Sequence, residues 1–149
     1  MPLIHKQNPN ILLHIIGSNP PSEILKLSSN KIKVWGYVEN VDKLFNFSRV
    51  FVSPLRYGAG IKGKINLAME YGLPVVGTSI GFEGMHMKSG KDCIVANDTQ
   101  AFASSVLSLY NDKKLWNKIS TNSIRVLERH FSPSTAKDSL QDLIFRIQP

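Results

Sequence analysis

The sequence has one cysteine and no long apolar run, and both absences narrow the classes of protein to which it can belong. A single thiol, Cys93, cannot form an intramolecular disulfide, which excludes the small secreted domains that depend on several disulfides. No stretch approaches the roughly 20 apolar residues of a membrane-spanning helix, and the first residues, MPLIHKQNPN, lack the apolar core of a signal peptide. We therefore expect a cytoplasmic protein in which Cys93 is a buried structural residue.

Acidic residues are also few, 11 against 18 basic residues, which gives a net charge of +7. A positive charge of this size suits anionic partners such as nucleic acid, anionic lipid or phosphorylated small molecules. The lysines are scattered, however, and the chain has neither an arginine-rich run nor the basic and aromatic pattern of a nucleic-acid-binding module. We expect no nucleic-acid partner and place most of this charge on a solvated surface.

The apolar residues that are present predict an α/β fold with a doubly wound parallel sheet. Short apolar runs alternate with segments of helical spacing, as in sheets whose strands are buried on both faces. The predicted strands are 11–17, 31–38, 50–55, 74–79 and 92–97, and the predicted helices between them are 22–27, 41–47 and 61–71. A length of 149 residues with 42% apolar content indicates one domain, residues 1–149.

The two ends of the sequence differ from this alternation. Residues from about 98 to 149 predict three helices, with Asp98 as the N-cap of the first, and with Ser132 and Pro133 opening the last. At the other end, residues 1–8 look like the tail of a helix, so the domain is expected to lack its first strand. In a doubly wound sheet that strand lies in the middle, and its loss leaves two open edges. We expect the edges either to close on each other or to drive self-association.

The segment RYGAGIKGK, 56–64, resembles two phosphate-binding motifs, but the sequence supports neither assignment. Gly58 to Gly63 matches the dinucleotide fingerprint G-x-G-x-x-G, but it follows the third visible strand, and the next strand ends without an acidic residue. Glu83 is at about the right distance but lies in a loop. Gly58 to Lys64 also matches the P-loop up to its last letter, where Ile65 replaces the Ser or Thr that coordinates magnesium.

The physics shared by the two motifs still predicts an anion site. Glycines let the backbone approach a ligand, and the start of a helix offers unpaired N–H groups and a positive dipole end. Arg56, Lys62 and Lys64 add cationic hydrogen-bond donors for phosphate oxygens. The alternative is that the glycines serve close packing of helix on strand and the lysines are merely solvated.

The longer segment SPLRYGAGIKGKINLAMEYGLPVVGTSIGFEG resembles the donor-binding half of the family-4 retaining glycosyltransferases, the group 1 glycosyl transferases of GT-B architecture. The resemblance covers nearly the whole chain, because NPNILLHIIGSNPPSEI, VWGYVENVDKLFNFSRVFVSPL and LYNDKKLWNKISTNSIRVLERHFS are similar to successive elements of that half. It implies a Rossmann-like domain that forms the C-terminal half of a GT-B enzyme.

The resemblance also implies a ligand and its binding residues. The diphosphate of a nucleotide-activated sugar is expected at the turn, with the base beside a strand end and an acidic loop on the same rim. The expected binding residues are Gly36, Tyr37, Val38, Arg56, Gly58, Ala59, Gly60, Ile61, Lys62, Lys64 and Glu83. The nucleotide-sugar is a donor substrate, so no cofactor or metal is expected. The acceptor-binding N-terminal domain is missing from this chain, and the intact enzyme is compatible with peripheral membrane contact.

Two departures from the family pattern bear on activity. Members often carry two glutamates, one in the turn and one in the following helix that holds the donor ribose, where this chain has Ala59 and Leu67. Glu70 is expected about one turn further on, on a different face. A catalytically inactive nucleotide- or partner-binding module is therefore the alternative to a sugar-transferring half-enzyme, and no catalytic residue is assigned.

The histidines and tryptophans give weaker predictions. His5, His14, His86 and His130 show no metal-ligand spacing, and the spacing of the chain argues for no catalytic triad. His14 is expected to be a satisfied core histidine, and Trp35 and Trp116 to be packing anchors. The role of His86 stays open.

Overall fold

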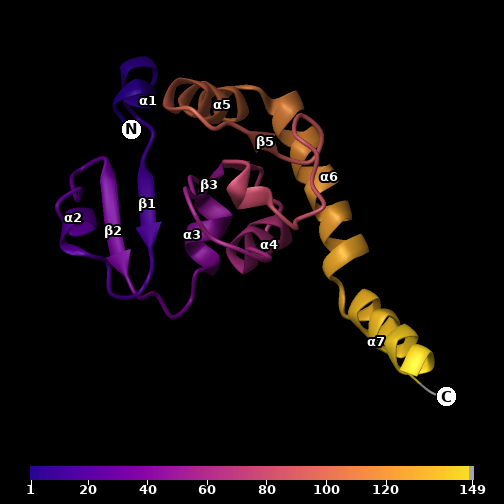
Figure 1. Cartoon of the computed structure of the whole chain (residues 1–149). Coiled ribbons are helices and arrows are strands. Elements are labelled where there is room, and N and C mark those ends of the chain that lie inside the picture. The colour runs from indigo at the N-terminus through magenta and orange to yellow at the C-terminus, as the bar shows by residue number, and fades with distance from the viewer. Residues whose placement is uncertain (148–149) are drawn as a thin grey trace. The chain divides into compact units, whose positions relative to one another are not determined.

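The computed structural model describes residues 1–147, which fall into two compact units, Met1–Ser48 and a second unit that begins at Arg49 (Figure 1). The prediction that residues 1–149 form one domain stays a prediction, and residues 148–149 lie outside the described part.

The first unit is a small parallel β-sheet with short helices. Its elements are α1 (Pro2–Gln7), β1 (Leu13–Ile16), α2 (Ser22–Leu25), β2 (Ile32–Gly36) and α3 (Asp42–Phe47). The two strands are parallel, with Leu13 opposite Ile32, and the predicted N-terminal helix is confirmed. Only three of the unit's apolar side chains are buried, Ile4, Ile11 and Phe45. At the end of β2 the Gly36 carbonyl accepts a hydrogen bond of 2.9 Å from the Gly17 N–H.

The second unit holds the larger core. Its elements are β3 (Phe51–Ser53), α4 (Gly63–Glu70), β4 (Val75–Gly77), the 3-10 helix η1 (Ile80–Phe82), β5 (Ile94–Val95), α5 (Thr99–Asn111), α6 (Lys113–Phe131) and α7 (Pro133–Ile147). The three strands are parallel in the order β3-β4-β5, and β4 is buried along its whole length, as expected for a central strand. The largest fully buried side chains include Ile65, Met69, Met85, Leu109 and Ile119.

The C-terminal helices begin at the predicted capping residues. The Asp98 carboxylate accepts a hydrogen bond of 2.8 Å from the Ala101 N–H at the start of α5. The Ser132 hydroxyl accepts one of 3.2 Å from the Thr135 N–H, and Pro133 is the first residue of α7. Asp112 caps α6 in the same way, through the N–H groups of Lys114 and Leu115. These side chains pair donors that the first helical turn would otherwise leave free.

The α/β fold class with parallel strands is confirmed, and all five predicted strands are present with shorter bounds. The 3-10 helix η1 was not predicted. The strands form two separate sheets, β1-β2 in the first unit and β3-β4-β5 in the second. Direct closure of the predicted gap stays a prediction. Self-association through the open edges stays a prediction. No helix in the described part is both long and apolar enough to cross a membrane.

The two tryptophans behave differently. In the second unit Trp116 donates from Nε1 to the Arg49 carbonyl over 2.6 Å, and the Arg49 guanidinium lies 5.8 Å from its ring, as expected for a packing anchor. Trp35 is 49% exposed, so the prediction of a packing anchor is wrong for it. It lies on the exposed side of β2, where its Nε1–H donates to Nδ1 of His14 over 3.0 Å. His14 is thus satisfied, but by a half-exposed partner.

Cys93 is fully buried and unpaired, as predicted. Desolvation by burial, with a smaller contribution from the charge of Asp92, raises the pKa of its thiol from 9.0 to about 12. Because the thiolate is the reactive form, we expect alkylation of the native protein by iodoacetamide at pH 8 to be slower by about a thousandfold than in denaturant. Mass spectrometry after timed quenching measures this at a single site. Equal rates in the two states would contradict it.

Candidate nucleotide-binding site

The turn between β3 and α4 is shaped by two glycines in the left-handed region. Gly58 has φ +136° and Gly60 has φ +71°, conformations that residues with a Cβ rarely adopt. A Cβ on Gly58 would meet only Lys62 Cε, at 3.8 Å, and a Cβ on Gly60 or Gly63 would meet no atom within 4 Å. The glycines of the turn are therefore required by backbone conformation. Close packing of helix on strand, the alternative considered from sequence, does not explain them.

The packing glycines lie instead at the end of β4 and in η1. A Cβ on Gly77 would lie 2.9 Å from the Phe82 ring, and one on Gly81 would lie 3.2 Å from the Ser53 carbonyl oxygen. Hydrogen bonds join the same strand ends, from Thr78 N to Ser53 O over 3.2 Å and from Ser79 N to Asn97 Oδ1 over 2.9 Å. The carboxyl ends of β3, β4 and β5 are thus held together as one rim, the edge at which open α/β sheets bind ligands.

The N-terminus of α4 points its free donors into the turn. Lys62 is the N-cap residue, and no side chain caps the helix. Its carbonyl accepts from the N–H groups of Ile65, at 2.8 Å, and Asn66, at 3.3 Å, so the helical ladder starts there. The first N–H groups of the helix and the positive end of its dipole favour an anion at this position.

Three cationic residues lie within or just before this helix start in the chain, Arg56, Lys62 and Lys64. Arg56 and Lys64 are exposed, and Lys62 is partly buried because its ammonium folds back and donates to the Gly60 carbonyl over 2.5 Å. An ammonium group has three donors, so this bond leaves two for a ligand. The bond also holds Lys62 over the turn, which places its charge near the uncapped N–H groups of α4.

The loop that carries Glu83 contacts the turn. The Lys62 N–H donates to the Met85 sulfur over 3.3 Å, and a Cβ on Gly84 would lie 4.0 Å from the Ile61 side chain. Glu83 itself is exposed at the end of η1. The structure therefore brings residues 84–85, which follow Glu83, next to Ile61 and Lys62 of the turn.

The three remaining predicted residues belong to the first unit. Gly36 ends β2 with φ +68°, Tyr37 is 74% exposed, and Val38 is partly buried. An exposed aromatic ring directly after a parallel strand is free to stack on a ligand base.

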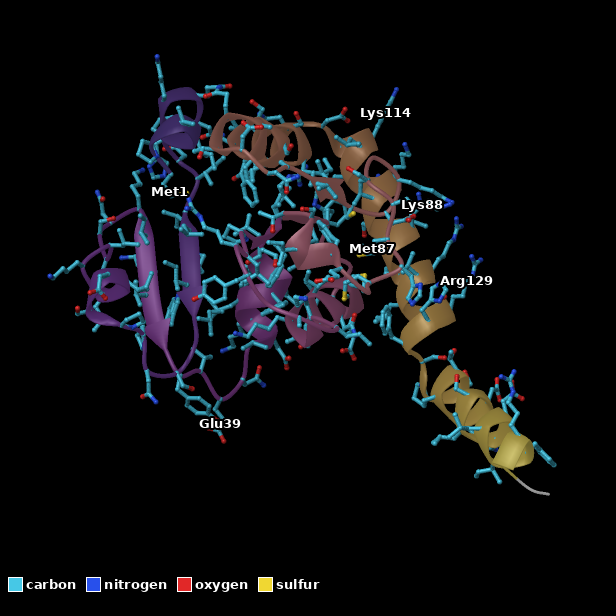
Figure 2. All side chains as sticks on the ribbon, viewed as in Figure 1. Met1, Glu39, Met87, Lys88, Lys114 and Arg129 are labelled. Atoms are coloured by element: carbon cyan, nitrogen blue, oxygen red, sulfur yellow. The ribbon has the colours of Figure 1, made fainter. Side chains whose placement is uncertain are left out.

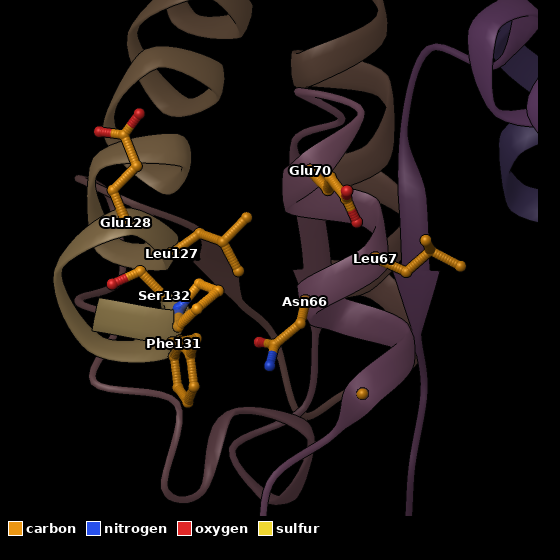
Figure 3. A pocket seen from close by; sticks show the side chains of 9 residues that line it. Asn66, Leu67, Glu70, Leu127, Glu128, Phe131 and Ser132 are labelled. Carbon is orange, nitrogen blue, oxygen red and sulfur yellow. The ribbon is translucent and has the colours of Figure 1, made fainter. Parts of the chain in front are cut away.

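A cavity of about 480 Å³ lies beside α4 (Figure 3). It is lined by Gly63, Asn66, Leu67 and Glu70 of α4 and by Leu127, Glu128, Phe131, Ser132 and Pro133 at the junction of α6 and α7. The Oδ1 atom of Asn66 is buried and has no hydrogen-bond partner among the described residues. Sequence reasoning missed Asn66, although an amide inside the apolar run INLAM is the signal that could have found it.

Leu67 is partly buried in α4, and it lines this cavity together with Glu70. Figure 3 shows the Leu67 side chain pointing away from the α6 residues that line the cavity, so the expectation that Glu70 lies on a different face of the helix stays a prediction. Leu67 lies outside the buried core, so a carboxylate at position 67 would not be fully desolvated.

Residues 1–147 contain no group of three or more His, Cys, Asp or Glu side chains that could hold a metal ion. The expectation that the site uses no metal stays a prediction.

Comparison with known proteins decides the family. Residues 1–112, about three quarters of the chain, match the family described as "Glycosyl transferases group 1". The chain belongs to the group 1 glycosyl transferases. A curated relative, an uncharacterized 44.6 kDa protein in the cps region of Klebsiella pneumoniae, is 28% identical over 93% of this chain. The chain spans 38% of the length of that relative.

Solved glycosyltransferase structures share the fold of this group 1 chain. The pneumococcal O-GlcNAc transferase GtfA, in complex with UDP and GlcNAc, has a TM-score of 0.77 and 16% identity, covering 98% of this chain and 31% of GtfA. TarM of S. aureus has a TM-score of 0.81 and 18% identity, and the match covers 95% of this chain and 30% of TarM. HepE of Anabaena, in complex with UDP-glucose, has a TM-score of 0.81 and 16% identity, and the match covers 98% of this chain and 44% of HepE. The predicted likeness to part of a GT-B enzyme is confirmed.

Proposed function

We propose that the turn from Arg56 to Lys64 binds the diphosphate of a nucleotide-activated sugar, and that the chain is the donor-binding half of a retaining glycosyltransferase. The observation that carries the proposal is the uncapped start of α4, next to two left-handed glycines and three cations. Membership of the group 1 glycosyl transferases supplies the ligand class, and the UDP complexes of GtfA and HepE support it.

The other predicted residues take roles around the diphosphate in this proposal. Contact of the base with Gly36, Tyr37 and Val38, which belong to the first unit, stays a prediction, and Glu83 lies in the loop whose Met85 contacts the turn. The unpaired Oδ1 of Asn66 accepts a hydrogen bond from a hydroxyl of the ligand. This bond removes the free-energy cost, about 1–3 kcal/mol, of leaving a buried acceptor without a partner. Arg56, Lys62 and Lys64 neutralise the phosphate charge in place of a metal ion. An acceptor-binding N-terminal domain completes the cleft.

Removing the two lysines of the turn tests the proposal. Each cation that bonds a phosphate oxygen contributes about 1.5–3 kcal/mol, and exposure to solvent reduces this value. We expect K62A/K64A to weaken the binding of UDP or GDP, measured by isothermal titration calorimetry, by about ten- to a hundredfold. Circular dichroism checks that the fold is retained.

A matched control is K113A/K114A, which removes two exposed lysines at the start of α6. The control has the same change in net charge, so we expect it to keep its affinity within about twofold. Equal weakening by both double variants would show that binding depends on net charge alone and would contradict a site at the turn.

One observation favours the second candidate, a catalytically inactive binding module derived from the same fold. Leu67 stands where relatives often carry the ribose-binding glutamate, and Ala59 replaces the glutamate of the turn. Both candidates predict binding at the turn. They differ in whether the chain supports transfer when an acceptor-binding domain is supplied, which is measured by assaying this chain together with such a domain.

A further inference from the structure

The second unit contains another cavity, with a volume of about 610 Å³. It lies between residues 86–92 and the C-terminal half of α6. Six basic side chains line it: His86, Lys88, Lys91, Arg125, Arg129 and His130. Figure 2 shows Lys88 and Arg129 beside α6 on the same side of that helix. The cavity shares no lining residue with the turn or with the cavity beside Asn66.

Little negative charge offsets these cations. Asp92 is the one carboxylate among the residues that line the cavity, and it is only 5% exposed. Its Oδ2 accepts a hydrogen bond of 2.9 Å from the Lys88 N–H, so the carboxylate is engaged by the backbone of its own loop. In the described part of the chain Lys88, Lys91, Arg125 and Arg129 form no ion pair, and all four are exposed.

The loop is fixed to the helix, so the cations have a defined arrangement. The Asn122 side chain donates to the Lys91 carbonyl over 3.0 Å, and the Lys118 ammonium donates to the Gly90 carbonyl over 2.9 Å. At the other end the rings of His86 and His130 stack with centroids 4.4 Å apart and planes 11° apart. These contacts keep Lys88 and Lys91 of the loop facing Arg125 and Arg129 of α6, an arrangement that an anion would stabilise.

We propose that this cavity binds a phosphate-bearing anion, carried by a free diphosphate compound or by a lipid headgroup. Two arginines one turn apart on α6 present planar donor pairs suited to phosphate oxygens, and Lys88 and Lys91 supply point charges from the facing loop. The volume lies within the range of small-ligand pockets. This site is independent of the donor site at the turn, and it gives His86, which the sequence left without a role, a place in its wall.

The test compares R125Q/R129Q with K137Q/R146Q in the full chain. Each variant neutralises two exposed cations, on α6 in the first case and on α7 in the second, and glutamine keeps a polar side chain without the charge. Inorganic diphosphate is titrated by calorimetry, with amide chemical shifts locating the contact. Vesicles of phosphatidylglycerol and of phosphatidylcholine are used in a co-sedimentation assay.

We expect the wild-type chain to bind diphosphate or phosphatidylglycerol vesicles, with amide shifts at residues 86–92 and 122–130. R125Q/R129Q should lower that affinity by at least about tenfold, and K137Q/R146Q by less than about twofold. Binding of diphosphate identifies a free phosphate compound as the ligand class, and binding of the anionic vesicles alone identifies a lipid headgroup. Failure of the wild-type chain to bind either probe, or equal weakening in both variants, would overturn the proposal.

Failure of this site and failure of the donor site are distinguishable. Diphosphate at the turn would shift the amides of residues 58–64, and that signal should survive in R125Q/R129Q. If diphosphate shifts the turn but not residues 86–92 or 122–130, and anionic vesicles do not bind, the second site is refuted while the first stands.

Discussion

Sugar transfer by the 149-residue chain alone is expected to be below detection, even if the proposed site binds the donor. Glycosyl transfer requires a donor and an acceptor to be held in register, and such orientation accounts for roughly 7–11 kcal/mol of a reaction barrier. The chain spans only 30–44% of the length of the aligned glycosyltransferases, and the proposed site on it binds the donor. Losing this orientation would slow transfer by at least about 10⁵-fold.

The measurement is an assay with radiolabelled UDP-sugars and a panel of acceptors, with release of UDP measured in parallel. A donor-binding signal in the same preparation serves as the positive control, since it shows that the site is intact. Transfer to any acceptor above the rate without protein would contradict the half-enzyme interpretation.

Replacing Leu67 with glutamate is expected to tighten binding of a nucleotide-sugar without creating turnover. A hydrogen bond from a ribose hydroxyl to a carboxylate contributes about 1.5–3 kcal/mol, or about ten- to 150-fold in affinity. The helix position accepts the change, because Leu67 is partly buried beside a cavity of about 480 Å³ and lies outside the fully buried core. Repulsion from Glu70, which lines the same cavity, works against the gain.

Leu140→Glu provides the matched control for this substitution. Leu140 is 62% exposed on α7, so the variant makes the same chemical change away from the proposed site. Calorimetry with UDP-glucose should show tighter binding for Leu67→Glu and no gain for Leu140→Glu. Equal affinities of Leu67→Glu and the wild type, with the fold intact, would show that position 67 does not face the ribose.

The elements of the fold were predictable because their signals are local. The continuous apolar run PVVGTS marks β4, whose three residues are all buried. Asp98 and Ser132 mark the starts of helices through hydrogen bonds to backbone N–H groups three residues on, and Pro133 is the first residue of α7. The family was predictable from several motifs in the right order. The strand bounds were predicted too long, because only the central residues of each run pair with a neighbouring strand.

Other features depend on distant contacts and were not predictable. Trp35 is half-exposed because the face of β2 that carries it is not covered, and an alternating strand pattern does not reveal this. The motif letters of the turn did not separate glycines needed for conformation from glycines needed for packing. The φ angles of Gly58 and Gly60 and the close contacts that a Cβ at Gly77 would make distinguish these two kinds of glycine. Asn66 was missed because only the folded structure shows that its buried Oδ1 has no hydrogen-bond partner among the described residues.

Chemical-shift mapping of the 149-residue chain with UDP and GDP tests the central claim most directly, because it reports each amide separately. We predict that the largest perturbations fall at residues 56–64, where the left-handed glycines and the uncapped start of α4 lie, with smaller ones at 81–85 in the adjoining loop. Moderate salt should reduce the effect only in part, because a partly buried contact is less screened than a surface one. Perturbations confined to the helices after residue 98, with the turn unchanged, would contradict the account.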